Sequence, residues 1–235
     1  RFRFGAPSEQ ASPPTTTADD DDILADSAAG LRLSRSLGGV DVSALAYTGR
    51  DHEPLGRLRS ADGALNVERY HRRREVLGVS AAGARGSLAW RAELSHQPGR
   101  HFNLRDATGL ASTSLDQTTL GLGADLTLPL DLFANVQFVW DRVHDAPASL
   151  VRPDEDRLLT LFLRRGFAYE TIRTELRWYH SLTDHDDTFV ARARLEVNDS
   201  TSAYLSAEWF QGDDNGLFGQ FARQERIVLG VTHYY

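Results

Sequence analysis

The sequence predicts an all-β fold, an antiparallel transmembrane β-barrel that takes up residues 1–235 as a single domain. Three observations predict it. From residue 28 onward, apolar and polar residues alternate with the period of two that is typical of strands. Short and long connections alternate along the chain. In most predicted strands, one face is apolar and the other carries charges, which is the pattern of a barrel with lipid outside and water inside.

The composition excludes several kinds of protein. The 235 residues include no cysteine, so disulfides, zinc–thiolate sites and thiol catalysis are excluded. The net charge of −7 argues against a nucleic-acid partner. No run approaches the roughly 18 apolar residues that a membrane helix needs. We expect no cofactor, because no motif for one is present.

Eleven segments have the alternation of strands. Their predicted ranges are 28–36, 40–49, 70–82, 87–97, 117–128, 132–143, 157–164, 169–181, 188–197, 202–211 and 224–235. Residues 1–4 also alternate and precede a long connection, so they are predicted to end a strand that begins before the chain does. Since single-chain bacterial barrels have even strand numbers, the intact barrel is expected to have at least twelve strands, of which this chain is the C-terminal part.

The connections fall into two sets. The short set consists of residues 37–39, 83–86, 129–131, 165–168 and 198–201, which are rich in residues that favour tight turns. The other set consists of residues 5–27, 50–69, 98–116, 144–156, 182–187 and 212–223, of which only 182–187 is short. Membrane barrels have short periplasmic turns and longer extracellular loops, so 5–27 is predicted to be a long acidic extracellular loop.

The apolar face is predicted to meet lipid. All four tryptophans fall on it, and Trp140, Trp178 and Trp209 lie near the long-loop ends of their strands. Tryptophan is enriched where hydrocarbon meets the polar headgroups. We therefore predict an aromatic girdle that consists of Trp90, Trp140, Trp178 and Trp209.

The opposite face is predicted to line the lumen. Its charged residues nearly balance, and the lumen set comprises Arg91, Glu93, Asp125, Arg164, Arg173, Glu175, Arg177, Arg192, Arg194, Glu196 and Glu208. These side chains either line a water-filled pore or brace the wall through ion pairs, and the two roles are compatible. A register in which position numbers sum to 369 would place Arg173 opposite Glu196 and Glu175 opposite Arg194, with Glu208 against Arg192 on the next strand.

The end of the chain resembles the C-terminal assembly signal of outer-membrane proteins, on Ile227, Leu229, Val231 and the terminal Tyr235, although His233 departs from the usual apolar choice. The stretches 30–42 and 47–51 also look like proteobacterial porin-like barrels. This resemblance implies a place in the outer membrane of a Gram-negative cell. It implies contact with outer-membrane lipid, lipopolysaccharide and the barrel-assembly machinery, and it is compatible with a homo-oligomer.

Two acidic segments suggest other chemistry. Asp19–Asp22 is a conceivable calcium or cationic-solute site, but four consecutive acids usually form a solvated loop. Asp184–Asp187 and His144-Asp145 lie at predicted extracellular strand ends. In this they resemble outer-membrane proteases, which carry their catalytic Asp and His residues at such strand ends. There is no serine nucleophile motif, no glycine-rich phosphate loop and no metal-ligand spacing, so we expect no enzyme.

The function that these patterns favour is passive diffusion of small hydrophilic solutes through a porin-like channel. Two alternatives remain. One is a non-conducting barrel whose extracellular loops bind a partner or lipopolysaccharide. The other is a barrel hydrolase that uses His185 or His144.

Overall fold

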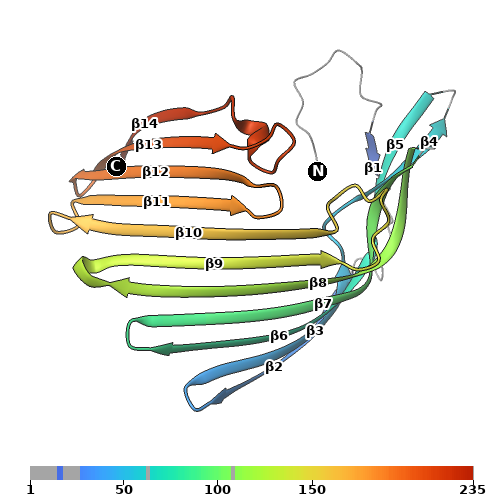
Figure 1. Cartoon of the computed structure of the whole chain (residues 1–235), viewed down its shortest axis with the longest axis horizontal. Helices are drawn as coiled ribbons and strands as arrows, with labels where there is room; N and C mark the ends of the chain where they lie inside the picture. Colours follow the sequence, from blue (N-terminus) through green and yellow to red (C-terminus); the bar gives the residue numbers. More distant parts are fainter. Residues whose placement is uncertain (1–14, 18–26, 62–63, 107–108, 235) are drawn as a thin grey trace.

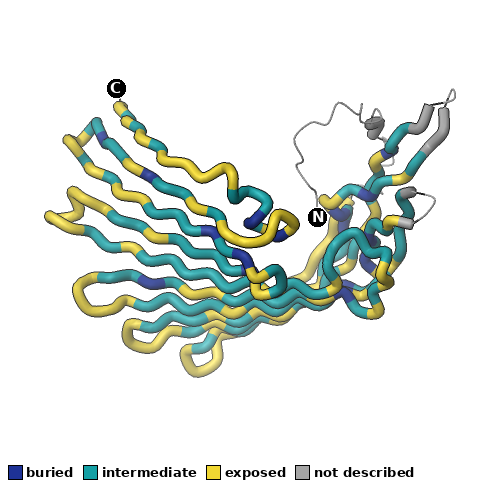
Figure 2. The backbone as a smooth tube through the Cα atoms, turned by 45° about the horizontal axis from the view of Figure 1, so that its top comes forward, coloured by how far each residue is buried: buried dark blue, intermediate teal, exposed yellow. Residues whose placement is uncertain are grey.

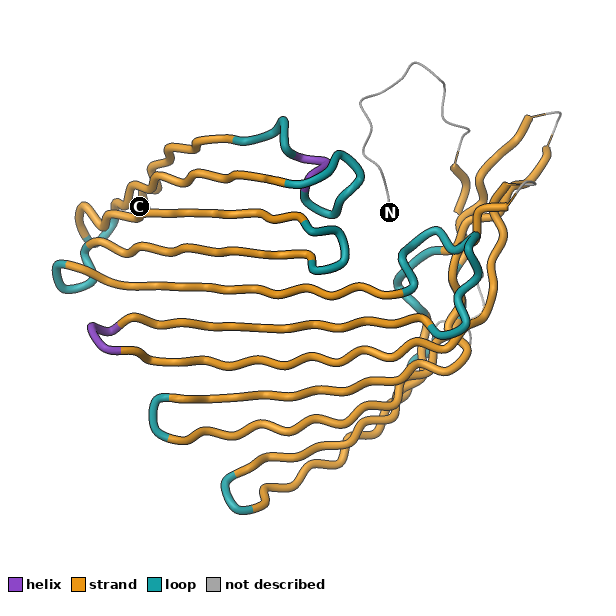
Figure 3. The backbone as a smooth tube through the Cα atoms, viewed as in Figure 1, coloured by secondary structure: helices purple, strands orange, loops and turns teal. Residues whose placement is uncertain are grey.

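The computed structural model describes residues 15–17, 27–61, 64–106 and 109–234, with the side chains of 15–17, 59–61, 64, 65, 106 and 109 left out. Most of the chain forms one antiparallel sheet, in which each strand pairs with the strands of that sheet that come before and after it along the chain (Figures 1 and 3). The sheet consists of β2 (Ala29–Leu37), β3 (Val40–Arg50), β6 (Arg73–Arg85), β7 (Leu88–Asp106), β8 (Gly109–Leu128), β9 (Leu132–Val143), β10 (Glu155–Phe167), β11 (Ile172–Ser181), β12 (Asp186–Asn198), β13 (Thr201–Gln211) and β14 (Arg226–His233).

These eleven strands confirm the predicted all-β, antiparallel fold and the eleven predicted segments. The two helices in the described part of the chain are the short 3₁₀ turns η1 (Pro129–Asp131) and η2 (Gly219–Phe221). No helix among the described residues is long and apolar enough to cross a membrane.

The sheet is strongly curved and open (Figure 2). Its edge strands are β2 and β14, and neither has a second partner strand within the described ranges. The described strands therefore do not close into a barrel. The predicted strand end at residues 1–4 lies outside the described residues, as does most of the predicted loop 5–27 apart from β1 (Thr15–Thr17).

Two connections that the sequence predicts as loops are largely β-structure. Residues 50–69 contain the hairpin of β4 (Leu55–Ala61) and β5 (Ala64–Tyr70), and β1 pairs in parallel with β5. Residues 98–116 extend the β7–β8 hairpin beyond an irregularity between Gln97 and Arg100. Gly99 lies there with φ of +60°, a conformation that glycine adopts without steric cost. The prediction was wrong because polar residues in a hairpin that projects from a sheet carry no apolar alternation.

The β4–β5 hairpin packs on this extension. The Gly56 N–H donates to Asn103 Oδ1 at 2.8 Å, and the Tyr70 and Ser112 hydroxyl oxygens lie 2.9 Å apart. The two hairpins project together from the same end of the sheet (Figure 1). This end carries the long connections and is called the loop end below; the opposite end carries the tight turns and is called the turn end.

The two faces of the sheet differ as the alternation predicts. On the apolar face, large side chains are exposed from one edge strand to the other, from Leu31 at 63% to Leu229 at 77%. On the polar face, small polar side chains are enclosed, with Gln117 at 3% and Ser206 at 1% exposure. The buried hydrophobic residues in the described part of the chain are Leu55, Phe102, Ala134 and Val143. A conventional apolar core is thus almost absent, and the apolar residues lie on the outside.

Candidate functional site: the polar face and the loop end

Charged side chains of the polar face are joined along and across strands. Arg91 on β7 pairs with Asp125 on β8 at 2.7 Å, and Asp125 also accepts a hydrogen bond from the Asn135 amide on β9. The Gln137 amide donates to Asn135 at 2.9 Å. These contacts form one polar chain across three neighbouring strands.

The register between β11 and β12 differs from the prediction by two residues. Arg173 lies opposite Arg194, Glu175 opposite Arg192, and Arg177 opposite Val190. The predicted pairing of Arg192 with Glu208 is also wrong, because Ser206 lies opposite Arg192. Hairpin register is set by the turn. Here the last residues to pair before the turn are Ser181 and Asp186, so Asp186 belongs to a strand although its residue type is typical of loops.

Ion pairs nevertheless form on this face, although most of these side chains pair with a residue other than the predicted one. Glu175 pairs with Arg177 at 2.9 Å, and Arg194 with Glu196 at 2.8 Å, each within its own strand. Arg173 lies 3.6 Å from Glu170 in the adjoining turn. Across strands, Arg226 pairs with Glu208 at 2.7 Å. Glu93 lies in the sheet opposite Ser80 and Gly121.

Three predicted lumen arginines also stack on aromatic rings, which the sequence analysis missed. Arg164 lies over Phe133 at 5.2 Å, Arg177 over Phe162 at 5.6 Å, and Arg192 over Tyr204 at 4.9 Å from the ring centroid. Phe133, Phe162 and Tyr204 occur at polar-face positions of the alternation, which was the available signal. Such stacking holds the guanidinium planes against the wall.

A buried network closes the loop end of β7, β8 and β9. Arg100 donates to Asp51 at 2.8 Å, to Glu53 at 2.5 Å and to Gln117 at 2.6 Å. The Gln117 amide then donates to Asp141 at 2.6 Å. Arg100 and Asp51 were absent from the predicted site because both lie in segments that were predicted as loops.

The Asp51 carboxyl at the start of this network has a pKa below its ordinary value. Burial alone raises the pKa, but hydrogen bonds from Arg100 and from the Glu53 N–H lower it, and so do the charges of Arg100 and Arg74. The net direction means that the network binds the ionised carboxylate.

The connection between β9 and β10 is held to the polar face by Arg152. Its guanidinium pairs with Asp141 on β9 and, at 3.2 Å, with Asp156 on β10. It also lies 6.0 Å from the centroid of the Phe102 ring. The segment is thereby tied to two strands rather than projecting into solvent.

The connection between β13 and β14 is anchored on Asp186. This carboxylate is fully buried, and its Oδ2 accepts hydrogen bonds from the N–H groups of Phe218 at 2.7 Å and Gly219 at 3.1 Å. The Phe218 ring contacts Tyr179 on β11 with centroids 6.3 Å apart. Residues 212–223 therefore fold back over the polar face.

Of the candidate catalytic groups, Asp184 and Asp186 take part in contacts that hold residues 212–223, and the two histidines lie on different connections. Asp186 is the anchor described above, and Asp184 accepts the Leu217 N–H at 3.2 Å. His144 Nε2 lies 2.9 Å from the Thr118 hydroxyl, on another connection than His185. Within the described ranges no group of three or more His, Cys, Asp or Glu side chains is placed to hold a metal ion. The predicted Asp19–Asp22 site lies outside the described residues.

The tryptophans of the predicted girdle lie on the apolar face. Near the loop end, Trp140 donates to Glu155 at 2.6 Å and Trp178 to Asp187 at 2.6 Å. Trp178 also stacks on His180 and Phe189. Trp209 is 45% exposed, whereas Trp90 lies toward the turn end opposite Gly83. Trp140 and Trp178 thus combine an apolar body with a polar contact at one level of the sheet.

The residues of the predicted assembly signal lie on the edge strand β14. Ile227, Leu229 and Val231 are 76%, 77% and 70% exposed, on the apolar face. His233 Nδ1 lies 2.8 Å from the Thr201 hydroxyl on β13. Tyr235 lies outside the described residues.

Comparisons with known proteins complete the description. No protein-family model matches the sequence, and no curated protein matches it. Among solved structures, the chain is similar to the beta domain of the Bordetella autotransporter Brka, at 16% sequence identity and a TM-score of 0.33. The similarity covers 88% of this chain and 89% of the other.

Proposed function

We propose that this chain is part of a bacterial outer-membrane β-barrel whose polar face lines a water-filled passage for small hydrophilic solutes. It acts by passive diffusion and not as an enzyme. In this proposal the apolar face contacts outer-membrane lipid and lipopolysaccharide, and the exposed apolar row on β14 is read by the barrel-assembly machinery.

The observation that carries the proposal is the inverted distribution of polarity over the sheet. Leucines such as Leu77, Leu195 and Leu205 are 53%, 43% and 51% exposed on the apolar face. Each such side chain is about half exposed, so in water it forgoes part of the roughly 1.5–3 kcal/mol that full transfer to an apolar medium brings. Lipid supplies that medium, and the polar face then needs water or polar partners, which a passage supplies.

The charges of the polar face support a passage without strong preference for one ion sign. Ion pairs such as Arg91–Asp125 and Arg226–Glu208 place opposite charges side by side along the wall. Paired charges produce a local transverse field but little net potential along the pore axis. Small polar solutes are the class that such a wall admits.

The inward folding of residues 212–223 and 144–154 favours a second candidate, a barrel that does not conduct and whose loop end binds a partner. Phe218 on Tyr179 and Arg152 on Asp141 place these two connections over the polar face. Conductance separates the two candidates.

The test is single-channel conductance of the full-length protein in planar bilayers, with the reversal potential measured in a salt gradient. We expect stable open steps and a reversal potential that shifts toward cation preference in Arg177→Gln/Arg192→Gln. The matched control is Arg35→Gln, which removes a charge from the apolar-face row of β2 and is expected to leave the reversal potential unchanged. A folded protein that inserts without open steps would overturn the channel and leave the loop-binding candidate.

A further inference from the structure

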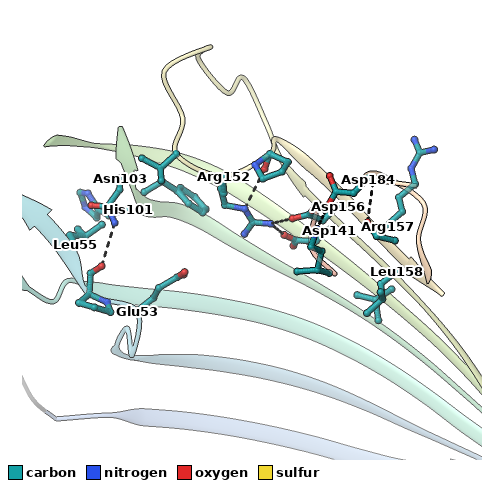
Figure 4. A pocket seen from close by; sticks show the side chains of 17 residues that line it. Glu53, Leu55, His101, Asn103, Asp141, Arg152, Asp156, Arg157, Leu158 and Asp184 are labelled. Atoms are coloured by element: carbon teal, nitrogen blue, oxygen red, sulfur yellow. Dashed lines mark hydrogen bonds and ion pairs between the residues drawn. The ribbon is translucent and has the colours of Figure 1, made fainter. Parts of the chain in front are cut away.

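A pocket lies at the loop end, between the polar face and the connections that fold over it (Figure 4). Its volume is about 460 Å³, within the roughly 300–1,000 Å³ of small-molecule sites. Its floor consists of strand ends, with Val139 on β9, Leu158 on β10 and Ser181 on β11. Its position is the mouth through which a solute on the loop side reaches the polar face.

The remaining walls are mostly apolar and come from distant parts of the sequence. Leu55 and Phe102, both 4% exposed, belong to the two projecting hairpins. Val151 comes from the connection that Arg152 holds, and Leu217 from the connection that Asp186 anchors. The pocket therefore depends on the docking of both connections, and an apolar group of a solute would find contacts on several sides.

The charges around the pocket are unequal. Four carboxylates line it, those of Glu53, Asp141, Asp156 and Asp184, against the two guanidiniums of Arg152 and Arg157. Arg152 is already bound by Asp141 and Asp156, and Arg157 is bound by Glu155, which does not line the pocket. Counted over the lining, four carboxylates stand against two guanidiniums, so negative charge is in excess there.

Glu53 and Asp156 expose 61% and 42% of their side chains, and each pairs with one arginine, Glu53 with Arg100 and Asp156 with Arg152. His101 does not offset the two carboxylates, because burial and the neighbouring Arg72 lower its pKa, so the ring is neutral at pH 7. An apolar cavity with carboxylates at its rim matches a solute that combines an apolar body with a positive charge.

We infer that this pocket binds small amphipathic organic cations, primary amines on a short apolar or aromatic body, before they pass along the polar face. The inference rests on the proposed function, since it names the solute class that the channel concentrates at its mouth. The ammonium group lies at Asp156, and the apolar body lies against Leu55, Leu158 and Leu217.

The test is isothermal titration calorimetry on the full-length protein in detergent, with 2-phenylethylamine as the probe. Phenylacetate and 2-phenylethanol are the matched anion and neutral probe. We expect saturable binding of the amine and at least tenfold weaker binding of the other two. Asp156→Asn is expected to weaken amine binding about tenfold while Arg152 keeps Asp141 as a partner. Asp199→Asn, the same change at an exposed turn-end residue, is expected to leave amine binding unchanged.

The inference and the proposed function fail separately. Equal binding of all three probes, or no binding by a protein that shows open steps, overturns the cation site and leaves the channel. Saturable, Asp156-dependent binding by a protein that never conducts supports the site and overturns the channel. If Asp156→Asn alters the thermal unfolding of the protein, Leu158→Ser at the pocket floor provides the second variant, with the same expected loss of amine binding.

Discussion

Arginine on the polar face is held by partners on the same strand as often as by partners on the next one. Glu175–Arg177 and Arg194–Glu196 are two residues apart, a spacing that puts both side chains on one face of a strand whatever its register. Such pairs form without correct strand pairing, so they fix side-chain direction but contribute little to the choice of register. Exposed pairs of this kind contribute about 0–1 kcal/mol each.

Asp51 is the residue whose ionisation is expected to control docking of the β4–β5 hairpin. Its folded pKa is lowered from the ordinary value of 3.8, so its contribution to stability is fully present above about pH 3.8 and is lost as the pH falls through the folded value. Asp51→Asn is expected to destabilise the protein by about 1–3 kcal/mol at pH 7, because it leaves the buried Arg100 short of a partner.

Thermal unfolding of the wild type and Asp51→Asn from pH 3 to pH 8 checks this. The difference in melting temperature is expected to stay constant above pH 5 and to shrink in the acid range. Asp199→Asn is the control. A difference that is unchanged down to pH 3 would contradict the role of the ionised carboxylate.

Asp186 is expected to hold residues 212–223 over the polar face. In Asp186→Asn the charge is lost and the Phe218 and Gly219 N–H groups meet a weaker acceptor, at a cost of about 1–3 kcal/mol. Trypsin cleavage at the exposed Arg223 is expected to become about tenfold faster, since each 1.4 kcal/mol is about a factor of ten in an equilibrium.

Asp184→Asn provides the comparison for this experiment, because Asp184 accepts one N–H, that of Leu217, on the same connection. A smaller increase in cleavage is expected there. Equal cleavage of the wild type and Asp186→Asn would show that the Asp186 carboxylate does not hold the connection, and that other contacts do, such as Phe218 on Tyr179 and Phe221 on Phe210.

At the scale of the element, period-two alternation was enough to predict every strand of the large sheet. It works here because each strand of this sheet has one mostly apolar face and one mostly polar face. It fails for residues 98–116 and 50–69, where polar residues interrupt the apolar alternation and where Asn103, Tyr70 and Ser112 make contacts between the two hairpins. The arginines that the sequence assigned to the lumen lie at polar-face positions of the sheet, and their place in a lumen stays a prediction. The network around Arg100 was not predictable, because it depends on how these hairpins fold back.

The register of β11 and β12 illustrates a second limit. Asp186 and Asp187 have the composition of a loop, since acids are depleted in strands. They lie in β12, where Asp186 accepts hydrogen bonds from the distant residues 218 and 219 and Asp187 accepts one from Trp178. The contact of Asp186 with residues 218 and 219 is not local, so the sequence of the hairpin itself could not show that Asp186 belongs to β12.

The pairing of β13 with β14 depends on a glycine opposite an aromatic ring. A Cβ at Gly230 would lie 2.3 Å from the Tyr204 ring, which in turn packs against Arg192. Gly230→Ala is expected to destabilise the protein by about 1–3 kcal/mol through overpacking. Urea or thermal unfolding in detergent measures this change.

Two variants control the experiment on Gly230. Gly121→Ala is expected to be nearly neutral, because a Cβ at Gly121 meets nothing within 4 Å. Adding Tyr204→Ala to Gly230→Ala is expected to recover most of the loss that overpacking causes. Additive effects of the two substitutions would mean that the Tyr204 ring is not what the new methyl group meets.

At the scale of the whole molecule, the apolar face is a belt that reaches from β2 to β14, with Leu31 and Leu229 exposed on the two edge strands. Trp140 and Trp178 mark the loop-end border, where their N–H groups reach Glu155 and Asp187. If the belt lies in hydrocarbon, these two indoles lie at the headgroup level.

Fluorescence quenching by brominated phospholipids in reconstituted vesicles tests this placement. Variants that keep only Trp140 or only Trp178 are expected to be quenched more strongly by bromines near the headgroup than by bromines near the chain ends. Quenching by neither lipid, with strong quenching by aqueous iodide, would place the belt in water and contradict the proposed membrane location.

The network of Asp51, Arg100, Gln117, Asp141 and Arg152 joins the loop ends of β7, β8, β9 and β10, whereas tight turns connect the strands at the opposite end. We therefore expect the loop-end rim of the sheet to be stiffer than the turn-end rim, with thermal bending that grows toward the turns and toward the edge strands β2 and β14. In the proposed channel, a solute would meet the most constant shape at the loop end and the most adaptable shape at the turn end.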